Sequence, residues 1–506
     1  MQLETNPPLN EEAKAHLAQC NDDESRNKTF LELFKEYFAS VPDAFAKAGG
    51  RVNLIGEHVD YPGLQFSGDH PSHLMSMGGS IQNSFLAALH IRDDQVLKLQ
   101  HLEARESFSL ELKDLLPLET KSVQEREDQT PMEQRSVPDW AHHSLACLRE
   151  LHRVKPLDRG MEVLLSSNVP HGAGMSNSAA NCVALTLCFK KAFKLSTLNE
   201  PQTIVDFART SERSDYVGGQ CGYLDQMLIV HSQEAQLTAL DYVGNQVSHF
   251  TSSLGPPWQF VAINTQVPHV LAESDYTHRV QELEIGISLM RKVFNKEIGS
   301  TFLSLTSYDQ LLHELAQTPS LQLPLEDKGY SIPEDAIPSM VEELLKNYQP
   351  PTCGDHPTLS PKESLALLLK RMRHQKSSSL IVPEAGRLAQ KGDAQGFGRL
   401  LDAEGKSLRM NGDFQITGSN GAQDALLDAG FQAGEELDVK VHGRMLGGGG
   451  GGNVLFLVKR DNEKLYQDWL TQTKNIYKQW SSKAFDHKGI EATVIEPTIG
   501  PGAYLI

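Results

Sequence analysis

Residues 48–61, with the sequence AGGRVNLIGEHVDY, constrain the fold and chemistry of this chain more than any other segment. The short apolar run of Val52, Leu54 and Ile55 predicts a strand that ends in a turn. A glycine pair precedes the run and lets the backbone approach a ligand closely. The segment places a cation, an imidazole and two carboxylates together: Arg51, Glu57, His58 and Asp60. Such a cluster suits a polyhydroxylated, phosphate-accepting ligand, and the alternative is a charged surface turn.

Residues 169–180 (VPHGAGMSNSAA) predict a glycine loop that opens a helix. Gly172 and Gly174 free the loop dihedrals, and Ser176 and Ser178 are favourable at a helix N-terminus. Apolar residues then recur at helical spacing: Ala180, Val183, Ala184 and Leu187. The positive end of such a helix fits a polyphosphate. The loop has no lysine and is not a Walker A loop, so the alternative is an ordinary capped core helix.

Two further segments carry weaker signals when taken alone. Asp225 lies in the stretch QCGYLDQ, where an aspartate is more often a helix cap than a catalytic group. Residues 447–452 are six consecutive glycines, a composition typical of a linker. The β-rich run NVLFLV follows them at once, which instead favours a tight turn that leads into a buried strand.

Together these segments resemble the galactokinases, a branch of the GHMP small-molecule kinases. Residues 48–61 resemble the family signature GRVNLIGEHTDYNGG, and residues 169–180 resemble PxGxGLSSSAA with Met175 and Asn177 as departures. Residues 221–226 resemble CGIMDQ, and the glycine tract resembles TGxGxGG. Weaker echoes occur around Tyr276 and in residues 407–424. The matches follow the family order from about residue 34 to the C-terminus.

The resemblance implies an α+β fold of two GHMP kinase domains with the active site in the cleft between them. It also implies ATP-dependent phosphorylation of the anomeric hydroxyl of galactose, with Mg²⁺ as cofactor. The implied catalytic residues are Asp225, as general base or orienter, and Arg51. The implied sugar-binding residues are Glu57, His58, Asp60, Gly222 and Tyr276. The implied ATP-binding residues are Gly172, Ala173, Gly174, Met175, Ser176, Asn177 and Ser178.

The Mg²⁺ site contains one departure from the family. Ser178 and a glutamate on the helix before Asp225 are the implied metal ligands. A count without gaps places Arg213 at the glutamate position, with Glu212 one residue earlier and Asp215 two residues later. A cation cannot ligate Mg²⁺, so we expect a one-residue shift that restores Glu212.

Departures near the sugar leave the substrate open. Val59 replaces the usual threonine, and residues 62–64 are Pro-Gly-Leu in place of Asn-Gly-Gly. A 1-kinase for N-acetylgalactosamine, galacturonate or arabinose is therefore one alternative. A non-catalytic sugar and ATP sensor is another, which ranks lower because Arg51, Asp225 and Ser178 are all present.

Composition sets the wider limits. A chain of 506 residues is too long for one compact core. We expect Pro256-Pro257 to divide it into domains at 1–255 and 256–506. An acidic, Pro-rich insertion is expected around residues 318–361. The net charge of −18 disfavours nucleic-acid or anionic-membrane partners. The chain shows neither an apolar run of membrane-spanning length nor a secretion signal at its start. Its six cysteines lack the spacing of a metal site. These features favour a cytoplasmic protein. A monomer suffices, and the oligomeric state stays open.

Overall fold

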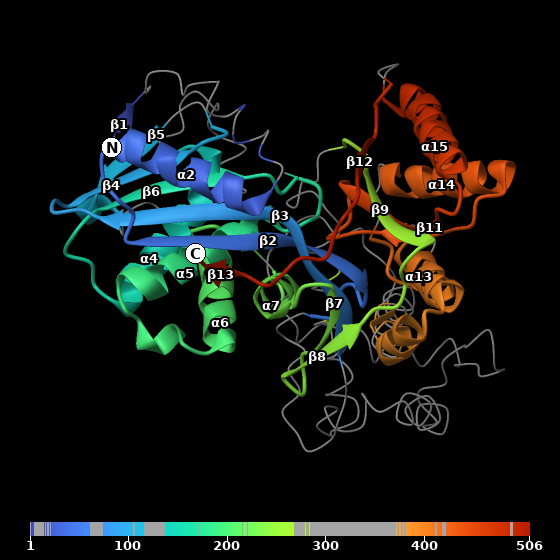
Figure 1. The fold of residues 1–506 in the computed structure, drawn as a ribbon, viewed down its shortest axis with the longest axis horizontal. Helices are drawn as coiled ribbons and strands as arrows, with labels where there is room; N and C mark the ends of the chain where they lie inside the picture. The colour runs from blue at the N-terminus through green and yellow to red at the C-terminus, as the bar shows by residue number, and fades with distance from the viewer. Residues whose placement is uncertain are drawn as a thin grey trace, which may run out of the picture.

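The structure is a computed structural model, drawn in Figure 1. The residues that it describes are 2–4, 15, 17, 20, 22–60, 74–104, 107–115, 137–170, 172–214, 216–219, 221–267, 279, 283, 371, 374, 375, 378, 381–409, 412–416, 421–485 and 489–506. Tyr276, Asp215 and the insertion at 318–361 lie outside the described residues, so the predictions that concern them stay predictions.

A nine-stranded sheet forms one half of the described chain. Its main path runs β1-β5-β4-β6-β3-β2-β13, and β7 pairs with β3 and β8. The bounds are β1 (Gln2–Glu4), β2 (Ala44–Ile55), β3 (Met75–Ile91), β4 (Val96–His101), β5 (Ser107–Glu111), β6 (Met161–Ser167), β7 (Gln236–Asp241), β8 (Gln246–Thr251) and β13 (Tyr504–Leu505). Among these pairs β4 and β6 are parallel and the others antiparallel.

Helices cover both faces of this sheet (Figure 1). One face carries α4 (His142–Val154), α5 (Asn177–Ala192), α6 (Pro201–Glu212) and α7 (Leu224–His231). The other face carries α2 (Asp23–Phe38), whose Phe30, Leu33 and Phe34 are buried against the sheet. Short 3₁₀ helices lie at Leu112–Asp114, Asp139–Ala141 and Ser196–Leu198. Helix α5 begins at Asn177, which confirms the predicted glycine loop that opens a helix.

A four-stranded antiparallel sheet forms the other half, in the order β10-β11-β9-β12. Its strands are β9 (Trp258–Asn264), β10 (Val441–Met445), β11 (Asn453–Lys459) and β12 (Thr493–Ile495). Alternate residues of β11 face opposite sides, as the period of a strand requires. Phe456 packs toward α14 (Ala422–Leu437) and α15 (Glu463–Ala484), and Leu455 packs toward α13 (Ala394–Leu408).

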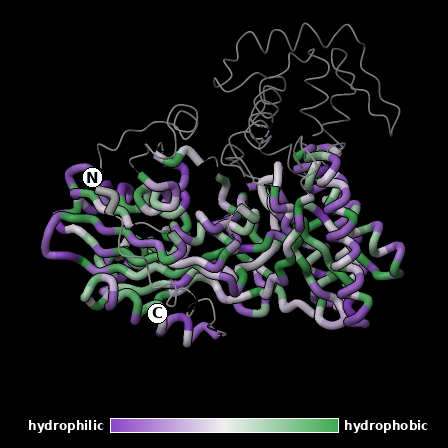
Figure 2. The backbone as a smooth tube through the Cα atoms, turned by 90° about the horizontal axis from the view of Figure 1, so that it is seen from above, coloured by the Kyte–Doolittle hydropathy of each residue, from purple (hydrophilic) through white to green (hydrophobic). Residues whose placement is uncertain are grey.

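The two halves share a hydrophobic core. Val52 and Met77 of the large sheet belong to the same buried cluster as Leu446 and Leu455 of the small sheet. Figure 2 shows apolar positions concentrated along the strands and hydrophilic positions in the outer loops. The α+β class is confirmed by these two sheets and their helices. The chain ends by returning to the large sheet as β13, and the proposed domain boundary at residue 256 stays a prediction.

Candidate active site

Strand β2 brings the signature segment against the glycine loop that precedes α5. The amide of Arg51 donates to the carbonyl of Met175 at 3.1 Å. A Cβ atom on Gly50 would lie 2.7 Å from the same carbonyl oxygen, a distance that side-chain-bearing residues do not tolerate. The glycine pair therefore lets the loop rest directly on β2. The close approach that we expected toward a ligand is, at Gly50, an approach to the protein's own backbone.

Asp225 is held from two sides. Arg51 donates from Nε to Asp225 Oδ1 at 2.8 Å, and Ser176 donates from Oγ to Oδ2 at 2.5 Å. Arg51 also donates from Nη1 to the carbonyl of Gly174. Asp225 lies in the first turn of α7, where the positive helix end favours a carboxylate. The side chain of Asp225 is 24 % exposed while that of Arg51 is 6 % exposed, so the carboxylate stays within reach of a ligand.

Glu212, the last residue of α6, lies beside Ser178. Ser178 Oγ donates to Glu212 Oε1 at 2.6 Å, and the side-chain Nε2 of Gln226 donates to Glu212 Oε2 at 2.6 Å. Burial raises the pKa of Glu212 to about 7, and the negative charge of Asp225 adds to that rise. Arg213 follows the end of the helix and points elsewhere, because its Nη1 donates to the carbonyl of Cys221 at 2.8 Å. The structure thus places Glu212, rather than Arg213, at the glycine loop.

Asp60 lies directly against the loop that carries Asp225. The amide of Leu224 donates to Asp60 Oδ2 at 2.8 Å. A Cβ atom on Gly222 would lie 2.1 Å from the same oxygen, so only glycine fits there. Burial raises the pKa of Asp60 to about 6, and the nearby Asp225 and Glu57 carboxylates also raise it. Arg209 supports this loop from the other side, since its Nε donates to the carbonyl of Gly222 at 2.9 Å.

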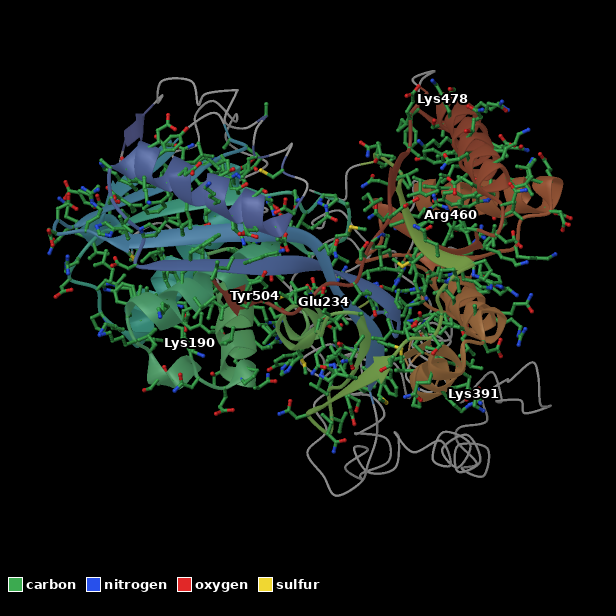
Figure 3. All side chains as sticks on the ribbon, in the orientation of Figure 1. Lys190, Glu234, Lys391, Arg460, Lys478 and Tyr504 are labelled. Atoms are coloured by element: carbon green, nitrogen blue, oxygen red, sulfur yellow. The ribbon has the colours of Figure 1, made fainter. Side chains whose placement is uncertain are left out.

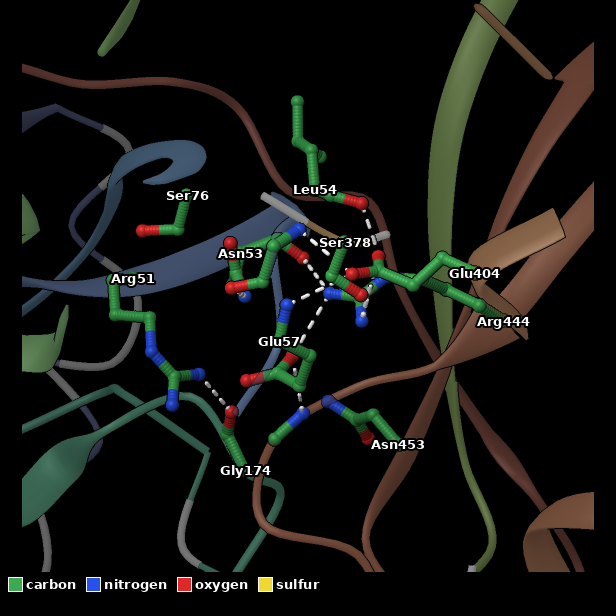
Figure 4. Close-up of polar contacts among 12 residues, drawn as sticks. Arg51, Asn53, Leu54, Glu57, Ser76, Gly174, Ser378, Glu404, Arg444 and Asn453 are labelled. Atoms are coloured by element: carbon green, nitrogen blue, oxygen red, sulfur yellow. Dashed lines mark hydrogen bonds and ion pairs between the residues drawn. The ribbon is translucent and has the colours of Figure 1, made fainter. Parts of the chain in front are cut away.

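Glu57 and His58 are almost completely buried, each 3 % exposed. Glu57 Oε2 accepts from Arg444 Nη2 at 2.8 Å, and in Figure 4 its other carboxylate oxygen points toward Arg51. The ring of His58 stacks on Phe414 with 4.8 Å between centroids. Packing from the small-sheet half therefore fixes both residues.

The glycine tract is an ordered turn that packs on the glycine loop before α5. A Cβ atom on Gly447 would lie 3.0 Å from Gly174 Cα, and one on Gly452 would lie 3.3 Å from the carbonyl oxygen of Gly172. Leu446 donates from its amide to the Asn453 carbonyl at 3.0 Å, where β11 begins. The tight turn into a buried strand is confirmed, and a flexible linker is excluded.

Comparison with known proteins agrees with this geometry. The model of the GHMP kinases N terminal domain matches residues 142–233, and that of the galactokinase galactose-binding signature matches residues 32–65. The two matched segments contain the glycine loop, Asp225 and the signature segment of this chain. Galactokinase from Staphylococcus carnosus is 24% identical over 474 residues, which cover 94% of this chain and 97% of the relative. Galactokinase from Enterococcus faecalis is 26% identical over 435 residues, with 85% and 90% covered.

A solved structure of Lactococcus lactis galactokinase complexed with galactose superimposes on this chain with a TM-score of 0.66. The two are 22% identical, and the match covers 94% of this chain and 99% of that one. The likeness shows that the fold is shared across both halves. The match to the GHMP kinases N terminal domain indicates a phosphotransferase that uses ATP.

Sequence reasoning gave no role to several residues that hold the site together: Arg209, Gln226, Glu404 and Arg444. Two of them left a signal in the sequence, because Gln226 closes the motif at residues 221–226 and Arg444 directly precedes Met445, Leu446 and the glycine tract. Arg209 and Glu404 lie on helices outside these motifs. Within the part of the chain that the structure describes, no helix is long and apolar enough to cross a membrane.

Proposed function

We propose that this protein is a galactokinase that transfers the γ-phosphoryl group of ATP to the anomeric hydroxyl of galactose. The observation that carries the proposal is the Asp225 carboxylate, fixed by Arg51 and Ser176 where the glycine loop meets α7. Asp60, from the galactose-binding signature segment, lies against the same loop. In this proposal Asp225 would orient the sugar hydroxyl between the segment that binds the sugar and the loop that binds the phosphates.

The phosphates of ATP would lie at the N-terminus of α5. The glycine loop ends at Ser176, and the first amides of the helix beyond it have no acceptor within the helix. These amides and the helix dipole favour an anion. Residues 172–178 supply this cradle, and the glycine tract holds it from the other side.

The transfer step needs an oriented hydroxyl and compensation for the charge on the phosphoryl group. Asp225 would accept the hydrogen bond of the anomeric hydroxyl and take the proton that this oxygen loses. The sugar oxygen forms its bond to the γ-phosphorus as the bond from that phosphorus to the bridging oxygen of ADP breaks. Arg51 lies between Asp225 and the glycine loop, where its guanidinium stabilises the charge on the transferring group.

The remaining galactose hydroxyls would contact the signature turn. Asp60 offers a carboxylate beside Asp225, Glu57 offers the oxygen that faces Arg51, and His58 forms the buried wall behind them. Gly222 leaves room where a side chain would collide with Asp60. We keep Tyr276 as a further proposed sugar contact, on the strength of the sequence motif alone.

Ser178 and Glu212 fit a Mg²⁺ site. Their oxygens are 2.6 Å apart, and a hydroxyl and a carboxylate are the hard oxygen donors that this ion prefers. Among the described residues there is no group of three or more His, Cys, Asp or Glu that could hold a metal, so phosphate oxygens and waters would have to complete the coordination. When bound, the ion neutralises charge on the β- and γ-phosphates.

We propose that the enzyme is cytoplasmic, and its oligomeric state stays open. The described cysteines are free thiols, as is usual in a reducing compartment.

An ATP-consumption assay over a sugar panel tests the proposal. The panel contains galactose, N-acetylgalactosamine, galacturonate and arabinose, with glucose as the epimer control. Asp225→Asn, purified in the same way, measures contaminating kinase activity. We expect turnover with galactose far above that background and formation of galactose 1-phosphate. Preference for another panel sugar would reassign the substrate, and background turnover with every sugar would favour the sensor.

A further inference from the structure

Arg444 is a fully buried cation that binds the signature segment from the opposite half of the molecule. It lies in β10, is 0 % exposed, and reaches across to the end of β2 (Figure 4). Its Nε donates to the carbonyl of Leu54 at 3.0 Å. Its Nη2 donates to the carbonyl of Asn53 at 2.6 Å and to Glu57 Oε2 at 2.8 Å. One guanidinium therefore fixes both the backbone of residues 53–54 and the carboxylate of Glu57.

Glu404 of α13 binds the same turn beside Arg444. Its Oε1 accepts from the amides of Gly56 and Glu57 at 2.8 and 2.9 Å. Its Oε2 lies 3.3 Å from Arg444 Nη1. The backbone of residues 53–57 is thus held at its carbonyls by a cation and at its amides by an anion, both from the small-sheet half.

Buried ion pairs of this kind contribute little to the stability of the fold. Two buried carboxylates share one buried guanidinium, and each ion loses its hydration when it is buried, so an apolar replacement of similar volume is often at least as stable. What buried ions with directional bonds do provide is a fixed geometry. Here the group whose geometry they fix is Glu57, whose second oxygen faces Arg51 (Figure 4).

We infer that Arg444 is a positioning residue for sugar recognition, which acts by fixing the Glu57 carboxylate. The inference rests on the proposed function. A second contact extends the effect toward the phosphates, because the amide of Gly447 donates to Glu57 Oε2 at 3.4 Å and Gly447 packs on Gly174. Glu57 is therefore the point at which Arg444, the glycine tract and the sugar turn meet.

The test compares Arg444→Lys with wild type and with Arg460→Lys. Lysine keeps the charge but cannot bind two carbonyls and a carboxylate together, since its ammonium is a compact point charge. Arg460 is the matched control, because it forms exposed ion pairs with Glu463 and Glu496 in the same half (Figure 3). We expect Arg444→Lys to raise the sugar KM at least tenfold, with the ATP KM within threefold of wild type. Arg460→Lys should change neither.

A double-mutant cycle separates positioning from a merely structural role. Glu57→Gln should raise the sugar KM as Arg444→Lys does, and adding Arg444→Lys to Glu57→Gln should change that KM less than threefold further. A change in thermal stability or kcat with an unaltered sugar KM would overturn the inference, as would independent effects that multiply in the double variant. If Arg444→Lys does not fold, an unaltered sugar KM in Glu57→Gln overturns it equally.

The sugar in these assays is whichever one the wild type phosphorylates in the panel. Failure of wild type on galactose thus refutes the proposed substrate, whereas the inference is judged only from ratios of variant to wild type.

Discussion

Glu212 and Arg213 offer the sharpest test of the site, because neighbouring residues at the end of α6 point in different directions. Glu212 faces Ser178 at 2.6 Å, and Arg213 faces the Cys221 carbonyl at 2.8 Å. We expect Glu212→Gln to raise the Mg²⁺ concentration for half-maximal activity about 10–100-fold, the range already seen when a residue behind a metal ligand is removed. Arg213→Gln should leave that concentration unchanged.

Although we expect Glu212→Gln to impair Mg²⁺-dependent activity, it should not destabilise the metal-free protein. Burial raises the pKa of Glu212 from 4.5 to about 7, and a tenfold change in proton affinity is worth about 1.4 kcal/mol. Ionising this carboxyl at pH 8 therefore costs the folded state about 3 kcal/mol. Because its pKa is raised, this cost is absent below pH 4.5 and grows as the pH rises toward 7. Glutamine carries no charge, so we expect Glu212→Gln to be at least as stable as wild type at pH 8.

The assay is activity against free Mg²⁺ at pH 8, with thermal unfolding in EDTA measured alongside. Arg213→Gln should lose about 1 kcal/mol of stability, the worth of one hydrogen bond, with normal Mg²⁺ dependence. The reasoning fails if Glu212→Gln keeps the wild-type Mg²⁺ dependence while Arg213→Gln is crippled. That result would put Arg213 on the nucleotide phosphates.

Three further predictions concern the sugar and phosphoryl side. Asp225→Asn should retain ATP binding, measured by calorimetry. Its kcat should fall about 10²–10⁴-fold, since the asparagine side chain cannot take the hydroxyl proton. Turnover within tenfold of wild type would remove Asp225 from the mechanism. Arg51→Lys should lose about 2–4 kcal/mol of transition-state stabilisation, measured as kcat/KM, and an effect on KM alone would assign Arg51 only to ground-state binding. The sugar KM should rise as the pH falls through about 6, where Asp60 becomes protonated, and a KM profile that is flat from pH 5 to 8 would contradict that role.

The sequence marked the residues that meet at the proposed reaction centre because each lies in a motif. Arg51 follows a glycine pair in a strand, and Ser176 ends a glycine loop. Asp225 comes from a third segment 174 residues after Arg51, and the fold brings all three into hydrogen-bond contact. The Asp225 segment was a weak signal by itself, and only the joint resemblance of the segments to the galactokinases implied that the three residues act together.

Contacts between the halves could not be predicted in this way. Arg444 and Glu57 are 387 residues apart, and strand alternation indicates only which face a residue occupies. A count along the chain also put Arg213 where the structure puts Glu212, because the end of α6 decides which side chain turns toward Ser178. Both features depend on tertiary packing, which local periodicity does not predict.

The contacts that the arginines of the proposed site already make predict a large role for the proposed Mg²⁺ ion. Arg444 is shared by two carboxylates, Arg213 binds a loop carbonyl, and Arg51 already uses Nε and Nη1 on Asp225 and Gly174. The glycine loop itself carries no lysine. Within the described part of the site, the charge of the triphosphate must therefore be met chiefly by the amides at the start of α5 and by Mg²⁺. A chain with a net charge of −18 can bind ATP on these terms, and loss of the Glu212 carboxylate should be felt at every Mg²⁺ concentration short of saturation.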